Sequence, residues 1–318
     1  MILRFLVRYI LENEFIKVSV MSEEKNKYEI LLFYKYVPID DPEYFAKKHL
    51  KFCKELGVMG RVLVAKEGIN GTVSGTMNQT EAYIEAFRKD PRFEDMEFKR
   101  EETEGHTFQR ISVKARNEIV TLKLEDDVNP NVVTGTHLSP KEWQETMENE
   151  DVIILDARND YEYDIGHFRN AIRPDIKAFR ELPEWIKENL ADKKDKKILT
   201  YCTGGIRCEK FSGYLVREGF EDVNQLHGGI IKYGQDPETK GSNFDGKCFV
   251  FDDRMIVDVN RTDDKSVVGR CIHCGQEAEH FVNCPIDECD KLHIACEKCR
   301  ENYQNCCSDE CKQVYLTT

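Results

Sequence analysis

The sequence predicts a multidomain protein of the α/β and α+β classes, with a mixed N-terminal domain, a central parallel-sheet domain and a C-terminal zinc-binding module. Strand and helix patterns follow the order βαββαβ over residues 28–122. Short apolar runs separated by helical patterns fill residues 137–235, as is typical of buried parallel strands. Nine of the 13 cysteines crowd into residues 271–311 at the spacings of metal ligands.

Residues 1–27 are expected to form an N-terminal extension. The chain begins like a signal peptide, but Glu12 and Glu14 interrupt the apolar run and no small-residue cleavage site follows. We therefore expect residues 1–20 to be a dispensable helix or a wrongly assigned extension, with Met21 as an alternative start.

The N-terminal domain, residues 28–122, is expected to be ferredoxin-like and acylphosphatase-like, because its element order matches that pattern. Asp41 and Pro42 begin a helix that ends at Gly57, and its apolar face places His49 and Cys53 in the core. The expected strands are 28–36, 61–65, 72–75, 96–100 and 109–114, with a loop at 66–71 and a second helix over 79–89.

An acidic segment with Pro130, residues 123–136, is predicted to link this domain to the central one, residues 137–235. There a capping box from Ser139 to Glu142 begins a helix. The apolar runs suited to parallel strands are 152–155, 198–201 and 223–226. Residues 236–318 are expected to hold a hairpin that turns at Asp252 and Asp253, followed by the cysteine-rich module.

The composition limits the classes of partner. The net charge of -13 has the wrong sign for a general nucleic-acid coat, and no DNA partner is expected. No stretch approaches the roughly 20 apolar residues of a membrane helix, so no membrane partner is expected either. Without an export signal, the cysteines are expected to be thiols or metal ligands in a reducing cytoplasm.

The strongest chemical signal is the loop formed by Cys202, Thr203, Gly204, Gly205, Ile206 and Arg207. A cysteine ends a buried strand, two glycines follow and a helix begins at once, so successive backbone N–H groups point into one concavity that stabilises an anion. The helix N-terminus and Arg207 add positive charge. We expect Cys202 to be a reactive thiolate nucleophile. The spacing Cys-x4-Arg is one residue shorter than the cysteine phosphatase loop, which favours sulfur or a small group over phosphate.

The central domain resembles a rhodanese domain, because four segments match that pattern in order and spacing. They are Leu155–Arg158, Gly166–Phe168 with Asn170 and Ala171, the Cys202 loop, and Leu226–Gly229. We expect Asp156 and Arg158 to brace the loop, and His167 to do the same, with a purely structural role favoured for each. Cys208 is expected to be packed, with resolution of an oxidised Cys202 as the alternative.

The resemblance extends over residues 28–311. Residues 60–75 and 247–254 are similar to signatures of the bacterial rhodanese-like tRNA uridine hydroxylases (TrhO). This resemblance implies hydroxylation of the wobble uridine to 5-hydroxyuridine with molecular oxygen, with Cys202 catalytic and the tRNA anticodon loop as partner. Cys202 would either add to the uracil ring or carry a persulfide. Candidate phosphate or base contacts are Lys66, Asn70, Arg110, Lys114, Arg158, Arg173, Lys177 and Arg207.

The cysteine-rich module contains enough thiols for two structural four-cysteine zinc sites. The ligands occur as four pairs: Cys271 and Cys274, Cys284 and Cys289, Cys296 and Cys299, and Cys307 and Cys311. The spacing does not show which pairs share an ion. Cys306 is left over, and His273, His280 or His293 could replace a thiolate at one corner. An iron–sulfur cluster is the lesser alternative.

Two other function classes fit parts of the chain. A sulfurtransferase carrying sulfane sulfur as a Cys202 persulfide fits the central domain equally well. A non-enzymatic module that binds a partner through its zinc sites fits the C-terminal region, but an adaptor has no use for an activated thiolate. The two flanking domains favour a macromolecular substrate.

Overall fold

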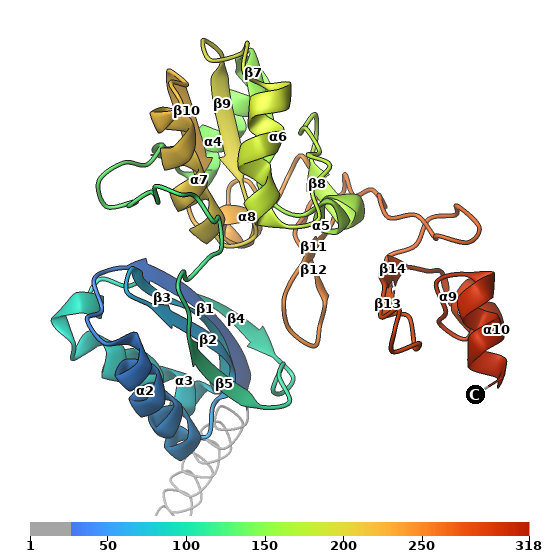
Figure 1. The fold of residues 1–318 in the computed structure, drawn as a ribbon, viewed down its shortest axis with the longest axis horizontal. Helices are drawn as coiled ribbons and strands as arrows, with labels where there is room; N and C mark the ends of the chain where they lie inside the picture. The colour runs from blue at the N-terminus through green and yellow to red at the C-terminus, as the bar shows by residue number, and fades with distance from the viewer. Residues whose placement is uncertain (1–26, 318) are drawn as a thin grey trace, which may run out of the picture. The chain divides into compact units, whose positions relative to one another are not determined.

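The computed structural model describes residues 27–317, so the expectations for residues 1–20 lie outside the described part. The described residues divide into two compact units, with the boundary between residues 119 and 120 (Figure 1). Among residues 27–317, every helix is too short or too polar to cross a bilayer.

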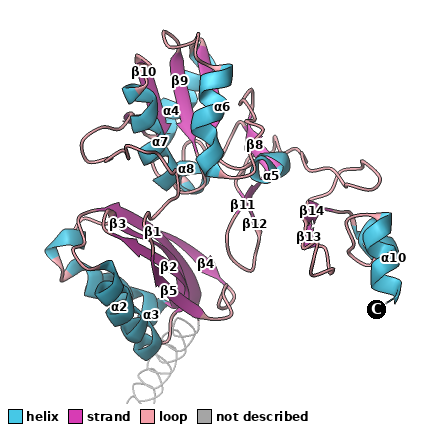
Figure 2. Ribbon diagram, in the orientation of Figure 1, coloured by secondary structure: helices cyan, strands magenta, loops and turns pink. Residues whose placement is uncertain are grey.

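A five-stranded mixed sheet and two long helices form the first unit (Figure 2). The strand order β4-β1-β3-β2-β5 contains the four-stranded ferredoxin-like core, and β5 extends it by pairing parallel with β2. The predicted fold of this region is therefore confirmed. The elements are β1 (Tyr28–Tyr36), α2 (Pro42–Leu56), β2 (Met59–Ala65), β3 (Gly68–Thr76), α3 (Met77–Arg88), η1 (Pro91–Phe93), β4 (Phe98–Thr103) and β5 (Ile111–Ala115).

The ends of α2 follow the capping rules. Asp41 accepts a hydrogen bond from the backbone N–H of Tyr44 at 2.9 Å, and Gly57 ends the helix with a φ of 83°. His49 lies in the core, where its Nε2 meets the Tyr83 hydroxyl at 2.8 Å. Burial lowers the pKa of His49 to about 4, so this side chain is neutral in the folded protein.

The loop predicted at 66–71 is wrong, because the glycines there belong to a strand. β3 begins at Gly68, and only two residues separate it from β2. A Cβ at Gly68 would lie 2.0 Å from the Lys35 carbonyl oxygen, and one at Gly71 would lie 2.5 Å from Cζ of Phe33. The glycines therefore allow β1 and its aromatic side chains to pack closely against β3.

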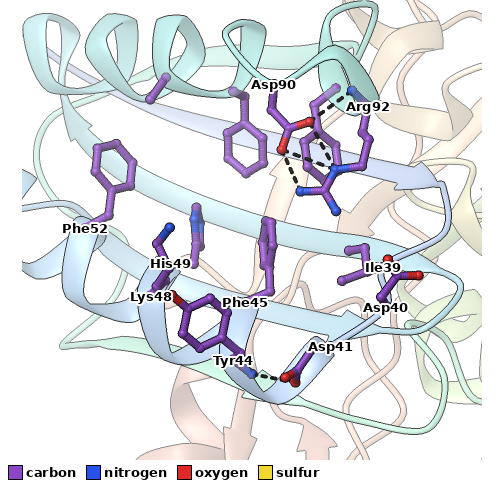
Figure 3. Close-up of a pocket in the computed structure, with 13 residues that line it drawn as sticks. Ile39, Asp40, Asp41, Tyr44, Phe45, Lys48, His49, Phe52, Asp90 and Arg92 are labelled. Carbon is purple, nitrogen blue, oxygen red and sulfur yellow. Dashed lines mark hydrogen bonds and ion pairs between the residues drawn. The ribbon is translucent and has the colours of Figure 1, made fainter.

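A hollow of about 410 Å³ opens between α2 and the segment that follows α3 (Figure 3). Phe45 and Phe93 line it, and the Arg92 guanidinium carbon lies 5.5 Å and 5.3 Å from their ring centroids. Arg92 is also paired with Asp90 at 2.6 Å. The hollow is therefore lined by aromatic rings and by the Arg92 guanidinium, which is already paired with Asp90.

A four-stranded parallel sheet is the centre of the second unit, with strand order β6-β10-β9-β7. This confirms the predicted parallel-sheet class. Its strands and helices are β6 (Thr136–Leu138), α4 (Pro140–Asn149), β7 (Val152–Asp156), α5 (Asp160–Ile165), η2 (Phe179–Glu181), α6 (Leu182–Asn189), β9 (Lys197–Tyr201), α7 (Ile206–Arg217), β10 (Asp222–Leu226) and α8 (Gly229–Gln235). Ser139 and Glu142 form the expected capping box at α4. The acidic segment 123–136 contributes Val128 to the core of this unit.

The predicted hairpin belongs to a second, three-stranded sheet. Its strands β11 (Phe244–Phe249) and β12 (Ile256–Asp258) are antiparallel, and β11 also pairs with the short strand β8 (Gly166–Phe168). The pairing of β8 with β11 was not expected from the sequence. It attaches the hairpin directly to a segment that carries part of the rhodanese pattern.

The cysteine-rich region forms short elements: β13 (Phe281–Asn283), β14 (Leu292–Ile294), α9 (Glu297–Tyr303) and α10 (Asp309–Thr317). A small core joins this region to the rest of the second unit, because Ile165 of α5 and Phe249 of β11 pack with Phe281 and Ile294. The cysteine-rich region therefore shares a core with the elements that surround the candidate active site.

Candidate active site and metal centres

The Cys202 loop lies at the carboxyl end of the central strand β9, between that strand and α7. Gly205 caps α7 with a φ of 102°, a conformation that favours glycine. Its backbone N–H donates to Sγ of Cys202 at 3.1 Å. Cys202 is only 1% exposed. The loop therefore encloses the sulfur and directs at least one backbone N–H to it.

The surroundings of Cys202 favour its thiolate. Burial raises the pKa of this thiol, but the hydrogen bond from the Cys208 thiol, the charge of Arg207 and backbone N–H groups outweigh burial and lower the pKa to about 5. Burial and the bond to Cys202 hold the pKa of Cys208 well above its ordinary value. Of the two neighbouring thiols, Cys202 therefore ionises first and Cys208 serves as its donor.

Arg207 is held by a carboxylate that the sequence did not single out. Its Nη1 and Nη2 donate to the two oxygens of Glu162 at 2.7 Å and 2.8 Å, and both side chains are buried. Nη2 also donates to Oγ1 of Thr203 at 3.2 Å. Glu162 belongs to a capping box with Asn159 at the start of α5, and this local pattern is the one sequence signal for it.

Asp156 and Arg158 form a second buried pair, with Arg158 Nη2 donating to Asp156 Oδ2 at 2.7 Å. The Tyr201 hydroxyl donates to the same carboxylate at 2.7 Å, and Arg158 donates to the carbonyl oxygen of Gly166 at 2.7 Å. Asp156 thus contacts Tyr201, the neighbour of Cys202, and Arg158 contacts the start of β8. His167 stacks on Tyr163 with ring centroids 3.8 Å apart.

Gly228 and Gly229, at the start of α8, bring a second helix against the Cys202 loop. Gly229 has a φ of 68°, and a Cβ there would lie 2.5 Å from the Cys202 carbonyl oxygen and 2.7 Å from that of Thr203. Backbone N–H groups of Ile230 and Ile231 donate to these same carbonyls at 3.0 Å and 3.1 Å. The first turn of α8 therefore holds the loop through backbone hydrogen bonds, and Gly229 allows the close approach.

Several predicted RNA contacts already have protein partners. Arg158 is buried, Arg173 pairs with Asp164 at 2.7 Å, and Lys177 pairs with Asp160. Lys66, Arg110 and Lys114 of that set are exposed in the first unit, and Lys177 is exposed as well although it is paired.

The cysteines of the C-terminal region gather into two groups of four. One group consists of Cys271, Cys274, Cys296 and Cys299. The other consists of Cys284, Cys289, Cys307 and Cys311. Within each group all sulfur atoms lie within 4.8 Å of one another. The first and third pairs along the chain therefore share one site, and the second and fourth pairs share the other.

The remaining candidate ligands lie outside these groups. Cys306 is fully buried, and its thiol donates to the carbonyl oxygen of Gln304 at 3.9 Å. His273 stacks on Tyr303 with centroids 3.7 Å apart, and His293 is buried. In residues 27–317, neither group of four includes a histidine.

The parallel sheet, with a cysteine of lowered pKa at the end of strand β9, is typical of a rhodanese-type domain. Three family descriptions match the chain: the UPF0176 acylphosphatase-like domain over residues 28–119, the rhodanese-like domain over 139–236 and the rhodanase C-terminal domain over 245–312. Together they cover the first unit, the parallel sheet and the cysteine-rich region.

Curated relatives match most of the chain. A tRNA uridine(34) hydroxylase of Bacillus licheniformis is 61% identical over 274 residues, which is 86% of this chain and 85% of the relative. Proteins of the same name from Staphylococcus saprophyticus and Oceanobacillus iheyensis are 58% and 57% identical, covering 85% and 87% of this chain and 85% of each relative. The chain belongs to the tRNA uridine(34) hydroxylase family, which confirms the resemblance inferred from its sequence.

Proposed function

We propose that this chain is an enzyme that hydroxylates uridine 34 of tRNA to 5-hydroxyuridine, with Cys202 as its reactive group. The observation that carries the proposal is the buried Cys202 thiol, whose pKa is lowered to about 5, in a family of tRNA uridine(34) hydroxylases. The substrate base belongs to the anticodon loop, where a single-stranded base can be splayed out and brought to the sulfur. We propose a cytoplasmic location, which a tRNA substrate and reduced thiols support.

Molecular oxygen is the proposed oxidant. Insertion of one oxygen atom into the C5–H bond of uracil, with the other leaving as water, requires two electrons and two protons in addition to O₂. The Cys202 thiolate contributes either by adding to the ring, which makes the neighbouring carbon electron-rich, or as a persulfide. In both versions the backbone N–H of Gly205 and the charge of Arg207 stabilise the sulfur anion.

The matched variants Cys202→Ala and Cys208→Ala test the role of the thiol. Purified protein is incubated with tRNA, air and a thiol reductant, and the digested nucleosides are quantified by mass spectrometry. Cys202→Ala is expected to form no 5-hydroxyuridine. Cys208→Ala is expected to keep reduced activity, because it loses one hydrogen bond to the sulfur while Arg207 and backbone N–H groups still stabilise the thiolate. Full activity of Cys202→Ala refutes the proposal.

The same nucleoside measurement distinguishes the sulfurtransferase alternative. If the chain carried sulfane sulfur to RNA, a thiolated nucleoside would depend on Cys202 and 5-hydroxyuridine would not. Anaerobic incubation adds a second criterion, because hydroxylation by O₂ stops without air and sulfur transfer does not.

The two four-cysteine groups are proposed to bind structural zinc. A tetrahedral ion with Zn–S bonds of about 2.3 Å separates its ligand sulfurs by about 3.8 Å. Cys274 and Cys296 lie 3.8 Å apart in one group, and Cys307 and Cys311 lie 3.8 Å apart in the other. Four thiolates leave no open coordination position, so these ions would stabilise the fold and take no part in the reaction.

A further inference from the structure

An exposed phenylalanine lies beside the candidate active site. In residues 27–317, Phe251 is the one phenylalanine that is exposed, with 51% of its surface accessible. The other phenylalanines of the described region are buried or half-buried. An exposed ring of this size leaves apolar surface in water, and burial of that surface against a partner would be favourable.

The hairpin between β11 and β12 holds Phe251 in place. Its Asp252 carboxylate accepts from Arg254 Nε and Nη2, each at 2.8 Å, and from the backbone N–H of Arg254 at 3.1 Å. The backbone N–H of Val250 donates to the carbonyl oxygen of Met255 at 2.8 Å. The ring is therefore presented by a hydrogen-bonded turn.

A buried aromatic contact supports the ring from behind. Phe249 is 7% exposed, and its centroid lies 5.3 Å from that of Phe251 at an interplanar angle of 80°. Phe249 in turn packs edge-on against Tyr161 of α5 and Phe281 of β13. Phe251 thus extends a buried aromatic cluster to the surface.

The same hairpin also contacts the Cys202 loop. The guanidinium carbon of Arg207 lies 5.9 Å from the Phe251 ring centroid. Three residues before Phe251, the chain is already close to the loop, because the Cys248 thiol hydrogen-bonds with the Thr203 side chain. Phe251 is therefore an exposed aromatic side chain separated from the reactive thiolate by a single loop residue.

We propose that Phe251 is a substrate-binding residue that stacks on a base of the anticodon loop while uridine 34 reaches Cys202. This inference rests on the proposed function and specifies the RNA contact at that site. A base splayed out of its loop loses its stacking neighbours, and an aromatic side chain replaces them with a π-face. Arg207 is hydrogen-bonded to Glu162. About half of the Phe251 surface is accessible, so this ring can stack on a base.

The test compares Phe251→Ala, Phe251→Leu and Phe251→Tyr in the full chain. The probe is a synthetic anticodon stem-loop RNA with an unmodified uridine 34. Loss of one stacked base is expected to weaken RNA binding by roughly 10- to 100-fold for Ala, with a smaller but clear loss for Leu, whereas Tyr binds like the unchanged protein. The pH at which the Cys202 thiol alkylates is expected to stay the same in all three, because the ring contributes no charge to the loop.

A tryptophan at this position gives a direct readout. In Phe251→Trp the added indole fluorescence is expected to be quenched when the stem-loop binds. Equal affinity and hydroxylation rate for Phe251→Ala and the unchanged protein would overturn the inference, as would RNA binding by Phe251→Trp without a change in fluorescence. If the unchanged protein binds the stem-loop through Phe251 but makes no 5-hydroxyuridine, the proposed reaction fails while the stacking contact stands.

Discussion

Arg207 and Glu162 are joined by two hydrogen bonds of 2.7 Å and 2.8 Å inside the second unit, so the guanidinium of the Cys202 loop is fixed by α5. Glu162 also accepts from the backbone N–H of Asn159 at 3.1 Å. The Glu162 carboxylate therefore connects the start of α5 to the Cys202 loop. It also fixes the Arg207 guanidinium, whose positive charge stabilises the Cys202 thiolate.

Glu162→Gln is expected to destabilise the protein strongly, because Arg207 would keep its buried charge and lose its ionic partner. The loss in the free energy of unfolding should be about 3–5 kcal/mol, as for other buried pairs that lose one member. Urea denaturation measures it. The control is Glu55→Gln, since Glu55 pairs with Lys51 on the surface of α2, and its change should stay below about 1 kcal/mol. Equal effects of the two variants would contradict this account of Arg207.

The alkylation rate of Cys202 is expected to rise with pH through about 5 and to be nearly constant from pH 6 to 8. The thiolate is the form that reacts. Hydrogen bonds and the charge of Arg207 stabilise it, so the alkylation rate rises at a lower pH than for a free cysteine. Iodoacetamide labelling followed by peptide mass spectrometry gives the rate for each cysteine, and Cys202→Ala identifies the peptide signal. A half-maximal rate near pH 8.5, the value of a free cysteine, would show that the loop does not activate the sulfur.

Gly229→Ala is expected to lose most hydroxylase activity and to unfold at a lower temperature. Its Cβ would lie 2.8 Å from the backbone nitrogen of Gly205 as well as close to two loop carbonyls, and its φ of 68° is unfavourable for alanine. Gly105→Ala is the matched control, because a Cβ there has no neighbour within 4 Å. Thermal unfolding and nucleoside analysis compare the two. A Gly229→Ala protein with unchanged activity would mean that α8 does not position the loop.

Protein purified without chelators is expected to contain two zinc ions per chain by elemental analysis. Cys271→Ser and Cys284→Ser should each lower the zinc content by about one, since the two residues belong to different groups. Cys306→Ser is the control and should retain both ions, because Cys306 lies outside both groups. Iron in place of zinc, or zinc loss in the Cys306→Ser protein, would contradict the assignment.

Local sequence patterns were sufficient to predict much of the secondary structure and the backbone of the Cys202 loop. The capping residue Asp41, the capping box at Ser139 and the Cys202 loop each depend on residues a few positions apart, and all three have the expected backbone arrangement. The strand β3 was partly missed because its glycines are typical of loops, whereas they serve close packing against β1.

Features that depend on distant parts of the chain were not predictable. Nothing near Glu162 indicates that it meets Arg207, 45 residues later. The spacing of the cysteine pairs is the same whichever pairs share an ion, so the alternating arrangement needed three-dimensional information. The β8 strand has three residues, too few for a periodic pattern.

The antiparallel pairing of β8 with β11 determines which fragments of this protein can fold on their own. A fragment that stopped at residue 236 would end before β11 (Phe244–Phe249), leaving the backbone groups of β8 without their strand partner. Such an open edge invites pairing with other molecules. The fragment would also lack the thiol that packs on Thr203, so the rhodanese segment is not a self-sufficient module.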